Sequence, residues 1–410
     1  MRKYAVLLLS LLAAITHAVE PTIAVTSAAQ RYPWNGMVDF TFTITGESGV
    51  KYTPSFVAKD LIGGTNLVIK TVHRVVDGTI ASPMDGFEAG TYSLVWDTAS
   101  DLPKGFRCDR VRVEGSVGNL YMVIDLSDGA NAIQWPILYL DAIPDGGWTD
   151  EYKTTKLALR RIPAGMDPLG RYTLTQDFFV GVFEVTQKQW QLIMGGFSSG
   201  SGELHYGTDD VRLPYIVSHD AIRGKSVGTQ WPMSSEVDVT SFIGVLRGKT
   251  GVDFDLPTEA QWEYACRAGT VSAYNNGGGT EADLKELGRY SGNKNDGRDD
   301  SYAHTTIVGS YAPNQWGLYD MHGNVWEWCL DWFDWHGSNT QTEILSGQNP
   351  RGPESGDWRV LRGGSVWSSA IECTSSNRGC NKPCYSNQYL SKDLDCSGYF
   401  GFRLCCHMKF

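Results

Sequence analysis

The sequence contains no block of lysine and arginine residues, and none of its cysteines forms the C-x2-C pair that is typical of zinc sites. Its 46 acidic residues outnumber the 35 basic ones, which gives a formal net charge of −11. Because nucleic acids and anionic membranes attract basic surfaces, we expect neither to be a partner. Beyond the N-terminal region, no apolar run reaches the roughly 20 residues that cross a bilayer, so we expect no membrane insertion.

The chain has abundant material for a folded core instead. Aromatic residues make up 12% of its 410 residues, too many for a disordered protein, and 46 glycines indicate many turns. The first 18 residues have a basic start at Arg2 and Lys3, an apolar stretch over residues 5–15, and small residues up to Ala18. This order is typical of a signal peptide. The sequence therefore predicts a bacterial protein that is secreted or periplasmic after cleavage near Ala18.

Nine cysteines are compatible with an oxidising compartment. Six of them are concentrated near the C-terminus: Cys373, Cys380, Cys384, Cys396, Cys405 and Cys406. This density predicts disulfides that fasten a loop-rich end of the chain. The total is odd, so at least one thiol stays free or pairs between chains, and the connectivity is open.

Residues 19–140 have the pattern of β-structure. Apolar and polar residues alternate in three segments, residues 38–44, 90–96 and 110–113. This alternation indicates strands with one buried face, and none of the segments shows a helical period. Several short strands over about 100 residues predict an immunoglobulin-like β-sandwich domain. We expect a final strand near residues 120–126 and a linker that runs to residue 156.

From residue 157 to the C-terminus the pattern is mixed. Three short helices are predicted, and each has a capping residue at its start: Thr186, Ser235 and Thr258. Glycines end them at residues 195, 251 and 269, and no long helix is predicted after that point. The chain is thus expected to be an α+β protein with three parts: a signal peptide (1–18), an all-β sandwich domain (19–140) and a mixed domain (157–410).

Six short blocks of the mixed domain carry a resemblance to a known family. They are residues 161–165, 183–186, 256–265, 316–328, 362–365 and 401–404, which read RIPAG, FEVT, LPTEAQWEYA, WGLYDMHGNVWEW, RGGS and GFRL. In this order they closely resemble the formylglycine-generating enzyme, or sulfatase-modifying factor, family. The resemblance implies a distorted C-type-lectin-like fold that is low in regular structure, stabilised by calcium, and carries its site on the loops of one face.

The resemblance also implies a place for the chemistry. Active members of the family use dioxygen and copper to convert a cysteine of a sulfatase peptide to formylglycine, and two cysteines five residues apart hold the copper. The matching positions here are Ser368 and Cys373. Cu(I) prefers soft thiolates to hydroxyls, so we expect no copper site and no copper oxidase activity. Arg362 and Ser365 precede these positions and are candidates for lining the pocket in either case.

The calcium positions of the family match better. The resemblance implies one ion with four ligands, two of them side chains and two main-chain carbonyls: Asp320, Glu327, Gly323 and Val325. Hard oxygen donors at this spacing suit Ca²⁺. A second ion would use Asp300 and the carbonyl of Tyr302, but the usual asparagine of its other half is missing.

Two classes of function compete. In the first, the chain is a calcium-stabilised binding or scaffold module, a pseudoenzyme whose loop face holds a protein, peptide or glycan ligand. The region from residue 367 to residue 400 is dense in polar and aromatic residues, as antibody loops are. Candidate contacts with the ligand are Trp367, Asn377, Tyr385 and Tyr389. In the second, the chain is a formylglycine-forming oxidase, or another metal-dependent oxidase, in which Cys373 acts.

A third hypothesis also comes from the resemblance. Variable proteins of diversity-generating retroelements are similar to this family and carry diversified residues at the same place. The chain would then be a variable binding protein.

An iron-dependent oxidase is a further alternative. It would have to assemble its iron ligands from histidines that are widely scattered along this sequence.

Overall fold

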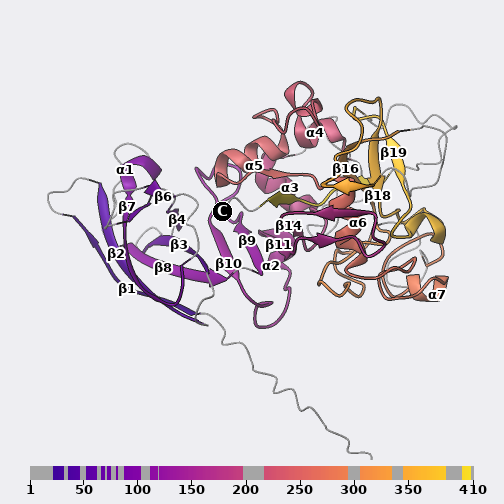
Figure 1. Cartoon of the computed structure of the whole chain (residues 1–410). Helices are drawn as coiled ribbons and strands as arrows, with labels where there is room; N and C mark the ends of the chain where they lie inside the picture. The colour runs from indigo at the N-terminus through magenta and orange to yellow at the C-terminus, as the bar shows by residue number, and fades with distance from the viewer. Residues whose placement is uncertain are drawn as a thin grey trace, which may run out of the picture.

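The computed structural model describes residues 22–31, 36–46, 52–61, 66–69, 72–74, 80–81, 87–102, 111–118, 120–196, 217–293, 305–334, 345–384 and 399–407. An N-terminal unit built from strands precedes a larger unit that mixes helices, strands and loops (Figure 1). Within these residues, no helix is both long enough and apolar enough to cross a bilayer.

The N-terminal unit consists of two antiparallel sheets. One has the strand order β1–β2–β7–β5–β6 and the other β4–β3–β8. The elements are β1 (Thr22–Gln30), β2 (Met37–Thr45), β3 (Thr53–Asp60), β4 (Asn66–Val68), β5 (Val72–Arg74), β6 (Ile80–Ala81), β7 (Gly90–Asp97), the short helix α1 (Thr98–Asp101) and β8 (Val111–Gly118).

Side chains from both sheets meet in one apolar core. Alternate residues of β2, namely Phe40, Phe42 and Ile44, are buried, as the period of two predicts. Phe56 of β3 packs edge-on against them, with ring centroids 4.8 Å from Phe40 and 4.7 Å from Phe42. The prediction of a region built from strands is therefore confirmed here, while its immunoglobulin-like character remains a prediction.

Two strands that follow β8 join the C-terminal domain. β9 (Tyr121–Asp125) pairs with β10 (Ile137–Leu140) on one side and with β11 (Lys156–Ile162) on the other. Met122 and Ile124 of β9 enter the core of the larger unit. The sequence analysis grouped both strands with residues 19–140, because an alternating pattern shows that a strand exists but not which strand it pairs with. In the structure β9 pairs with β11, and β10 pairs with β9, so both strands belong to the six-stranded sheet of the larger unit.

Three sheets organise the C-terminal domain. A six-stranded sheet has the order β10–β9–β11–β14–β21–β15, a four-stranded sheet β19–β18–β16–β20, and a small sheet β12–β13–β17. The remaining strands are β12 (Gly165–Met166), β13 (Tyr172–Leu174), β14 (Phe178–Gly181), β15 (Phe254–Asp255), β16 (Trp326–Trp332), β17 (Gly347–Gln348), β18 (Arg359–Arg362), β19 (Gly379–Asn381), β20 (Phe400–Gly401) and β21 (Cys405–His407).

The helices of this domain are short. They are α2 (Glu151–Thr154), α3 (Gln187–Met194), α4 (His219–Arg223), α5 (Phe242–Thr250), α6 (Glu259–Arg267) and α7 (Glu281–Leu284), with 3₁₀ turns η1 (Val227–Thr229) and η2 (Ala370–Cys373). Thr186 and Thr258 each close a capping box, with Gln189 and Gln261 respectively, so the predicted starts of α3 and α6 are confirmed. Every residue of α6 is buried, and this helix forms the centre of the domain.

The predicted helix start at Ser235 is wrong. The helix begins at Phe242, and the hydroxyl of Ser241 caps it by accepting a hydrogen bond from Gly244 N–H. Asp238 lies before this helix, and its carboxylate accepts hydrogen bonds from the main-chain N–H groups of Ser226 and Val227. A carboxylate can cap a turn on another segment as well as its own helix, and local sequence does not distinguish the two.

The predicted disulfides are not found among the described cysteines. Free thiols are present at Cys266, Cys329, Cys373, Cys384, Cys405 and Cys406. Cys405 and Cys406 are neighbours on β21, so their side chains point to opposite faces of the sheet and enter two different cores. Cys108 and Cys396 lie outside the described residues.

Candidate functional site

The loop after β18 carries the predicted copper positions. Ser365 N–H donates a hydrogen bond to Ser368 Oγ at 3.0 Å, and the two hydroxyl oxygens are 3.5 Å apart. Both side chains are buried. The Ser368 hydroxyl therefore closes a turn of the main chain and does not project into solvent.

Cys373 ends η2 and faces the interior. Its side chain is fully buried in a small apolar cluster with Tyr274, Leu287 and Tyr290. Burial raises the pKa of the thiol well above its ordinary value. The main chain at Gly364 covers the sulfur so closely that a Cβ there would lie 2.6 Å from Cys373 Sγ. This thiol is thus held as a neutral, enclosed group.

His322 fixes the main chain at Cys373. Its Nδ1 lies 2.7 Å from Cys373 O, which only accepts, and its Nε2 lies 3.2 Å from Asn275 N, which only donates. These partners require the neutral tautomer with the proton on Nδ1. Burial lowers the pKa of His322 to about 4, although the hydrogen bond to Cys373 acts in the opposite direction.

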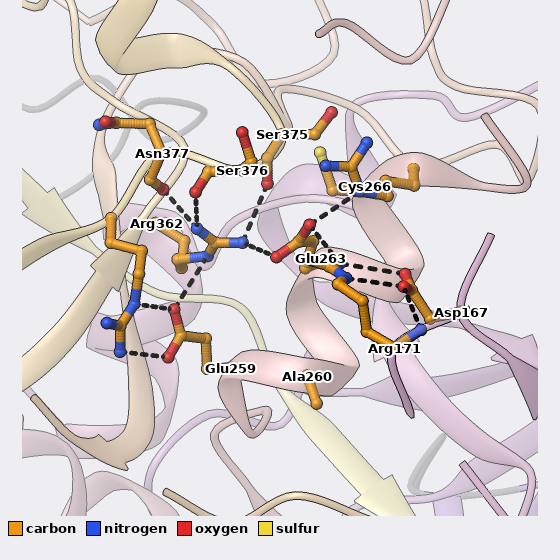
Figure 2. Close-up of polar contacts among 12 residues, drawn as sticks. Asp167, Arg171, Glu259, Ala260, Glu263, Cys266, Arg362, Ser375, Ser376 and Asn377 are labelled. Atoms are coloured by element: carbon orange, nitrogen blue, oxygen red, sulfur yellow. Dashed lines mark hydrogen bonds and ion pairs between the residues drawn. The ribbon is translucent and has the colours of Figure 1, made fainter. Parts of the chain in front are cut away.

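Arg362 holds the other end of the loop through hydrogen bonds to its main chain. Its side chain is fully buried. Figure 2 shows the guanidinium at the centre of a ring of acceptors. Nη2 donates to Glu263 Oε2 at 2.5 Å and to Ser375 O at 2.9 Å, and Nη1 donates to the carbonyls of Ser376 and Asn377. Arg362 thus joins the loop after β18 to Glu263 of α6.

Glu263 and Glu259 of α6 supply the negative charge of this network. Glu263 accepts hydrogen bonds from Arg171, Arg267 and Arg362 (Figure 2). Burial acts to raise the pKa of Glu263, but the three guanidinium charges hold it below its ordinary value. Glu259 accepts two hydrogen bonds from Arg378, which follows the loop. The loop is thus fixed to α6 by buried ion pairs.

Within residues 365–377 of the predicted binding loop, the exposed side chains are Trp367, Ser369 and Ile371. Trp367 is 42% exposed and Ile371 is 73% exposed, although both are apolar. Asn377 is half-buried, and its Nδ2 donates to Glu372 O. Tyr385 and Tyr389 lie outside the described residues. The exposed face of this rigid loop is therefore apolar at two positions.

Three predicted calcium ligands, Asp320, Gly323 and Val325, lie on one tight turn before β16, and Glu327 is the second residue of that strand. Asp320 and Asn324 both adopt the left-handed backbone region, with φ of 57° and 65°, and Gly323 between them has φ of 111°. Asp320 is buried, and its Oδ2 accepts a hydrogen bond from Gly309 N–H at 2.6 Å. Its Oδ1 is buried without a hydrogen-bond partner. Burial raises the pKa of Asp320 to about 6.

Glu327 is already paired with protein donors. Arg403 Nη2 donates to Oε1 at 2.6 Å, and Arg403 Nε and Trp262 Nε1 donate to Oε2. One hydrogen bond to Oε1 leaves this oxygen with a second lone pair. Glu327 can therefore contribute to a cation site only while it also binds Arg403.

A third buried carboxylate, Glu184, escaped the sequence analysis. Its Oε2 accepts from Asn324 Nδ2 at 2.8 Å, while its Oε1 is buried without a hydrogen-bond partner. Burial, followed by the charges of Asp320 and Glu327, raises its pKa well above the ordinary value. Its position inside block 183–186, one of the six blocks that carry the family resemblance, was its signal in the sequence.

These orphaned oxygens fit a hard cation. Three buried carboxylates share one guanidinium, Arg403, so the cluster carries more negative than positive charge. The described residues contain no group of three or more histidine, cysteine or acidic side chains placed to hold a metal together. A cation at this turn would thus rely on Asp320, on Glu327 and on main-chain carbonyls. Asp300 and Tyr302, the positions of the second ion, lie outside the described residues.

Comparison with known proteins identifies the family of the C-terminal domain. The model of the sulfatase-modifying factor enzyme 1-like domain matches residues 143–391, which is more than half of the chain. The chain belongs to this family. The resemblance inferred from the six sequence blocks is confirmed.

Relatives match over part of their length. The formylglycine-generating enzyme of Thermomonospora curvata is 39% identical over 140 residues, which are 31% of this chain and 44% of that enzyme. The chain therefore spans less than half of this relative. Among solved structures, Treponema denticola variable protein 1 is 28% identical with a TM-score of 0.43, and the alignment covers 62% of this chain and 96% of that one. PvdO from Pseudomonas aeruginosa is 21% identical with a TM-score of 0.44, and covers 61% and 94%.

Proposed function

We propose that this chain is a binding or scaffold module of its family and not a copper oxidase. The observation that carries the proposal is the side chain of Ser368. The resemblance assigns this residue to one of the two copper positions, and its hydroxyl accepts a hydrogen bond from Ser365 N–H. A hydroxyl in this role supports a turn and offers no soft donor to Cu(I).

The remaining copper position supports the same proposal. Cys373 is fully buried, and burial raises the pKa of its thiol. Copper binding and nucleophilic chemistry both use the thiolate, so a buried neutral thiol disfavours both. The oxidase hypothesis would require the loop to move away from Gly364 and also to supply a second thiolate.

The proposed ligand-binding face is the loop from residue 365 to residue 377. The buried side chains of Arg362 and His322 hold this loop by hydrogen bonds to its main-chain carbonyls. Trp367 and Ile371 are exposed on the loop. A loop that is already ordered loses little conformational entropy when it binds. Exposed aromatic and aliphatic side chains on such a loop suit the apolar parts of a protein, peptide or glycan ligand.

Calcium is part of the proposal. Asp320 and Glu327, with the carbonyls of Gly323 and Val325, would hold Ca²⁺, and the unpartnered Asp320 Oδ1 supports this assignment. The ion would balance the negative charge of the cluster and stiffen the turn that precedes β16. Export to the periplasm or the medium also remains a proposal, and it rests on the signal-peptide pattern of residues 1–18.

The test is incubation of the full chain with copper, dioxygen and a peptide that contains Cys-x-Pro-x-Arg, followed by mass spectrometry of the peptide. We expect the peptide mass to stay unchanged. Ser368→Cys is the matched variant, and we expect it to bind Cu(I) at least about tenfold more tightly than the wild type in an anaerobic titration. Conversion of the peptide by the wild type, or equal Cu(I) affinity of the two proteins, would contradict the proposal.

A further inference from the structure

A pocket of about 300 Å³ lies at the N-terminal end of α6. Four segments of the domain line the pocket. Their lining residues are Leu174 and Gln176, Trp231 and Ser235, Thr258 and Gln261 at the start of α6, and Asn349, Pro350 and Arg351. This volume is at the lower end of the range for small-molecule sites.

The pocket is separate from the proposed binding face. Thr258 and Gln261 belong to the first turn of α6, whereas Cys266, in its last turn, has its sulfur 3.8 Å from His322 Nε2. His322 in turn contacts the loop at Cys373. The nine residues of α6 separate the two sites by roughly 13 Å.

Arg351 gives the pocket a positive charge. Its guanidinium lies 4.1 Å from the centroid of the Trp231 ring, and Trp231 Nε1 donates a hydrogen bond to Arg351 O at 3.2 Å. Trp231 is buried, so the stacked guanidinium has a fixed platform. In the part of the chain that the structure describes, no carboxylate pairs with Arg351 and no acceptor takes its N–H groups. An arginine stacked in this way keeps its donors for a ligand.

The remaining lining combines apolar and polar groups. Leu174, Trp231 and Pro350 form apolar wall, while the exposed side chains of Gln176 and Ser235 make no hydrogen bond with any described residue. The pocket therefore combines the guanidinium of Arg351, the polar side chains of Gln176 and Ser235, and an apolar wall within one small volume.

We propose that this pocket binds a small hydroxylated carboxylate, of the chemical class of a sugar acid. The Arg351 guanidinium would accept the carboxylate as a bidentate partner. Gln176 and Ser235 would contact the hydroxyl groups, and the apolar wall would cover the carbon face of the ring. Because the pocket is small and closed on several sides, it suits a single small molecule better than an extended peptide.

The experiment is calorimetric titration of the full chain with glucuronate, with glucose as the matched neutral sugar. We expect glucuronate to bind with a Kd of about 1 mM or below, and glucose at least about tenfold more weakly. Arg351→Gln should weaken glucuronate binding by about tenfold or more, because it removes the charge. Ser235→Phe should abolish binding, because it fills the pocket.

Lys382→Gln is the matched control, since Lys382 also lies over an indole ring, that of Trp358, but outside the pocket. It should leave glucuronate affinity unchanged. Circular dichroism checks that the variants are folded, and Arg351 is exposed, so its replacement should not unfold the chain. Equal affinity for glucose and glucuronate, no glucuronate binding at 10 mM (about tenfold above the expected Kd), full binding by Arg351→Gln, or tighter binding of an acidic tetrapeptide would each overturn the proposal.

Discussion

Buried charged side chains of this protein differ in how well they are compensated. Glu263 has three arginine partners, and its pKa lies below the ordinary value. Asp331 has a different environment. Its Oδ2 accepts a hydrogen bond from Glu259 N–H at 2.8 Å, but its Oδ1 is buried without a hydrogen-bond partner. Burial, and then the charge of Glu259, raise the pKa of Asp331 to about 7.

This raised pKa predicts a pH dependence of stability. The folded chain keeps the Asp331 proton up to about pH 7, whereas an unfolded chain loses it near 3.8. The stabilisation is complete below the lower value and is lost as the pH rises toward the higher one. Asp331→Asn resembles the protonated form at every pH. We therefore expect the wild type to lose about 1–3 kcal/mol more unfolding free energy than this variant between pH 5 and pH 8.

Denaturant titrations at the two pH values measure this difference. Asp150→Asn is the exposed control, because the Asp150 side chain is 84% exposed. It should follow the wild-type pH dependence. If Asp331→Asn also follows the wild type, the carboxyl of Asp331 is ionised in the folded protein throughout this range, and the assignment is wrong.

Among the elements, the turn from Asp320 to Asn324 has the most unusual backbone. Two non-glycine residues with positive φ flank Gly323, and any side chain at Gly323 would collide with the main chain of Arg289. Such a turn is costly by itself and persists where its surroundings hold it. Asn324 helps to hold the turn, because its Oδ1 accepts a hydrogen bond from Thr306 N–H and its Nδ2 donates one to Glu184.

Removal of calcium tests the proposed role of this turn. A ligand that binds only the folded state stabilises it by about 2.7 kcal/mol at a hundredfold excess over Kd. We therefore expect a calcium chelator to lower the melting temperature by about 5 °C or more. Asp320→Ala should melt at a lower temperature than the wild type and should not respond to the chelator. A wild-type melting temperature that is the same with and without chelator would remove the ion from the proposal.

At the scale of the whole molecule, the membership of β9 and β10 in the six-stranded sheet has practical consequences. The main-chain hydrogen bonds of Leu120 join it to the six-stranded sheet, because Arg161 N–H donates to Leu120 O and Leu120 N–H donates to Leu140 O. Strand β9 then pairs with β11 in the same sheet. A chain that starts after residue 140 would lack two strands and would expose the core that Met122 and Ile124 help to fill.

Two fragments test the contribution of β9 and β10. The fragment 120–410 should fold, with a melting temperature close to that of the corresponding transition of the full chain. The fragment 143–410, which begins where the family match begins, should melt at least about 10 °C lower or fail to fold, because burial of several large apolar side chains is lost. Differential scanning calorimetry compares them. Equal stability of the two fragments would show that β9 and β10 are dispensable.

Local sequence determined those features whose interactions are local. The capping boxes at Thr186 and Thr258 join residues three positions apart, so the starts of α3 and α6 could be predicted. The alternation in β2 identified its buried face for the same reason. The six blocks identified the family, and the single difference at Ser368 already argued against a copper site.

Only the tertiary structure decided how distant segments meet. Nothing near Glu184 in the sequence shows that it approaches Asn324, and nothing near Arg362 shows that it binds Glu263. The partners of β9 and β10, and the stacking of Arg351 on Trp231, are likewise contacts between remote residues. Such contacts depend on chain topology and on the desolvation of buried groups, and both arise only when the whole core has formed.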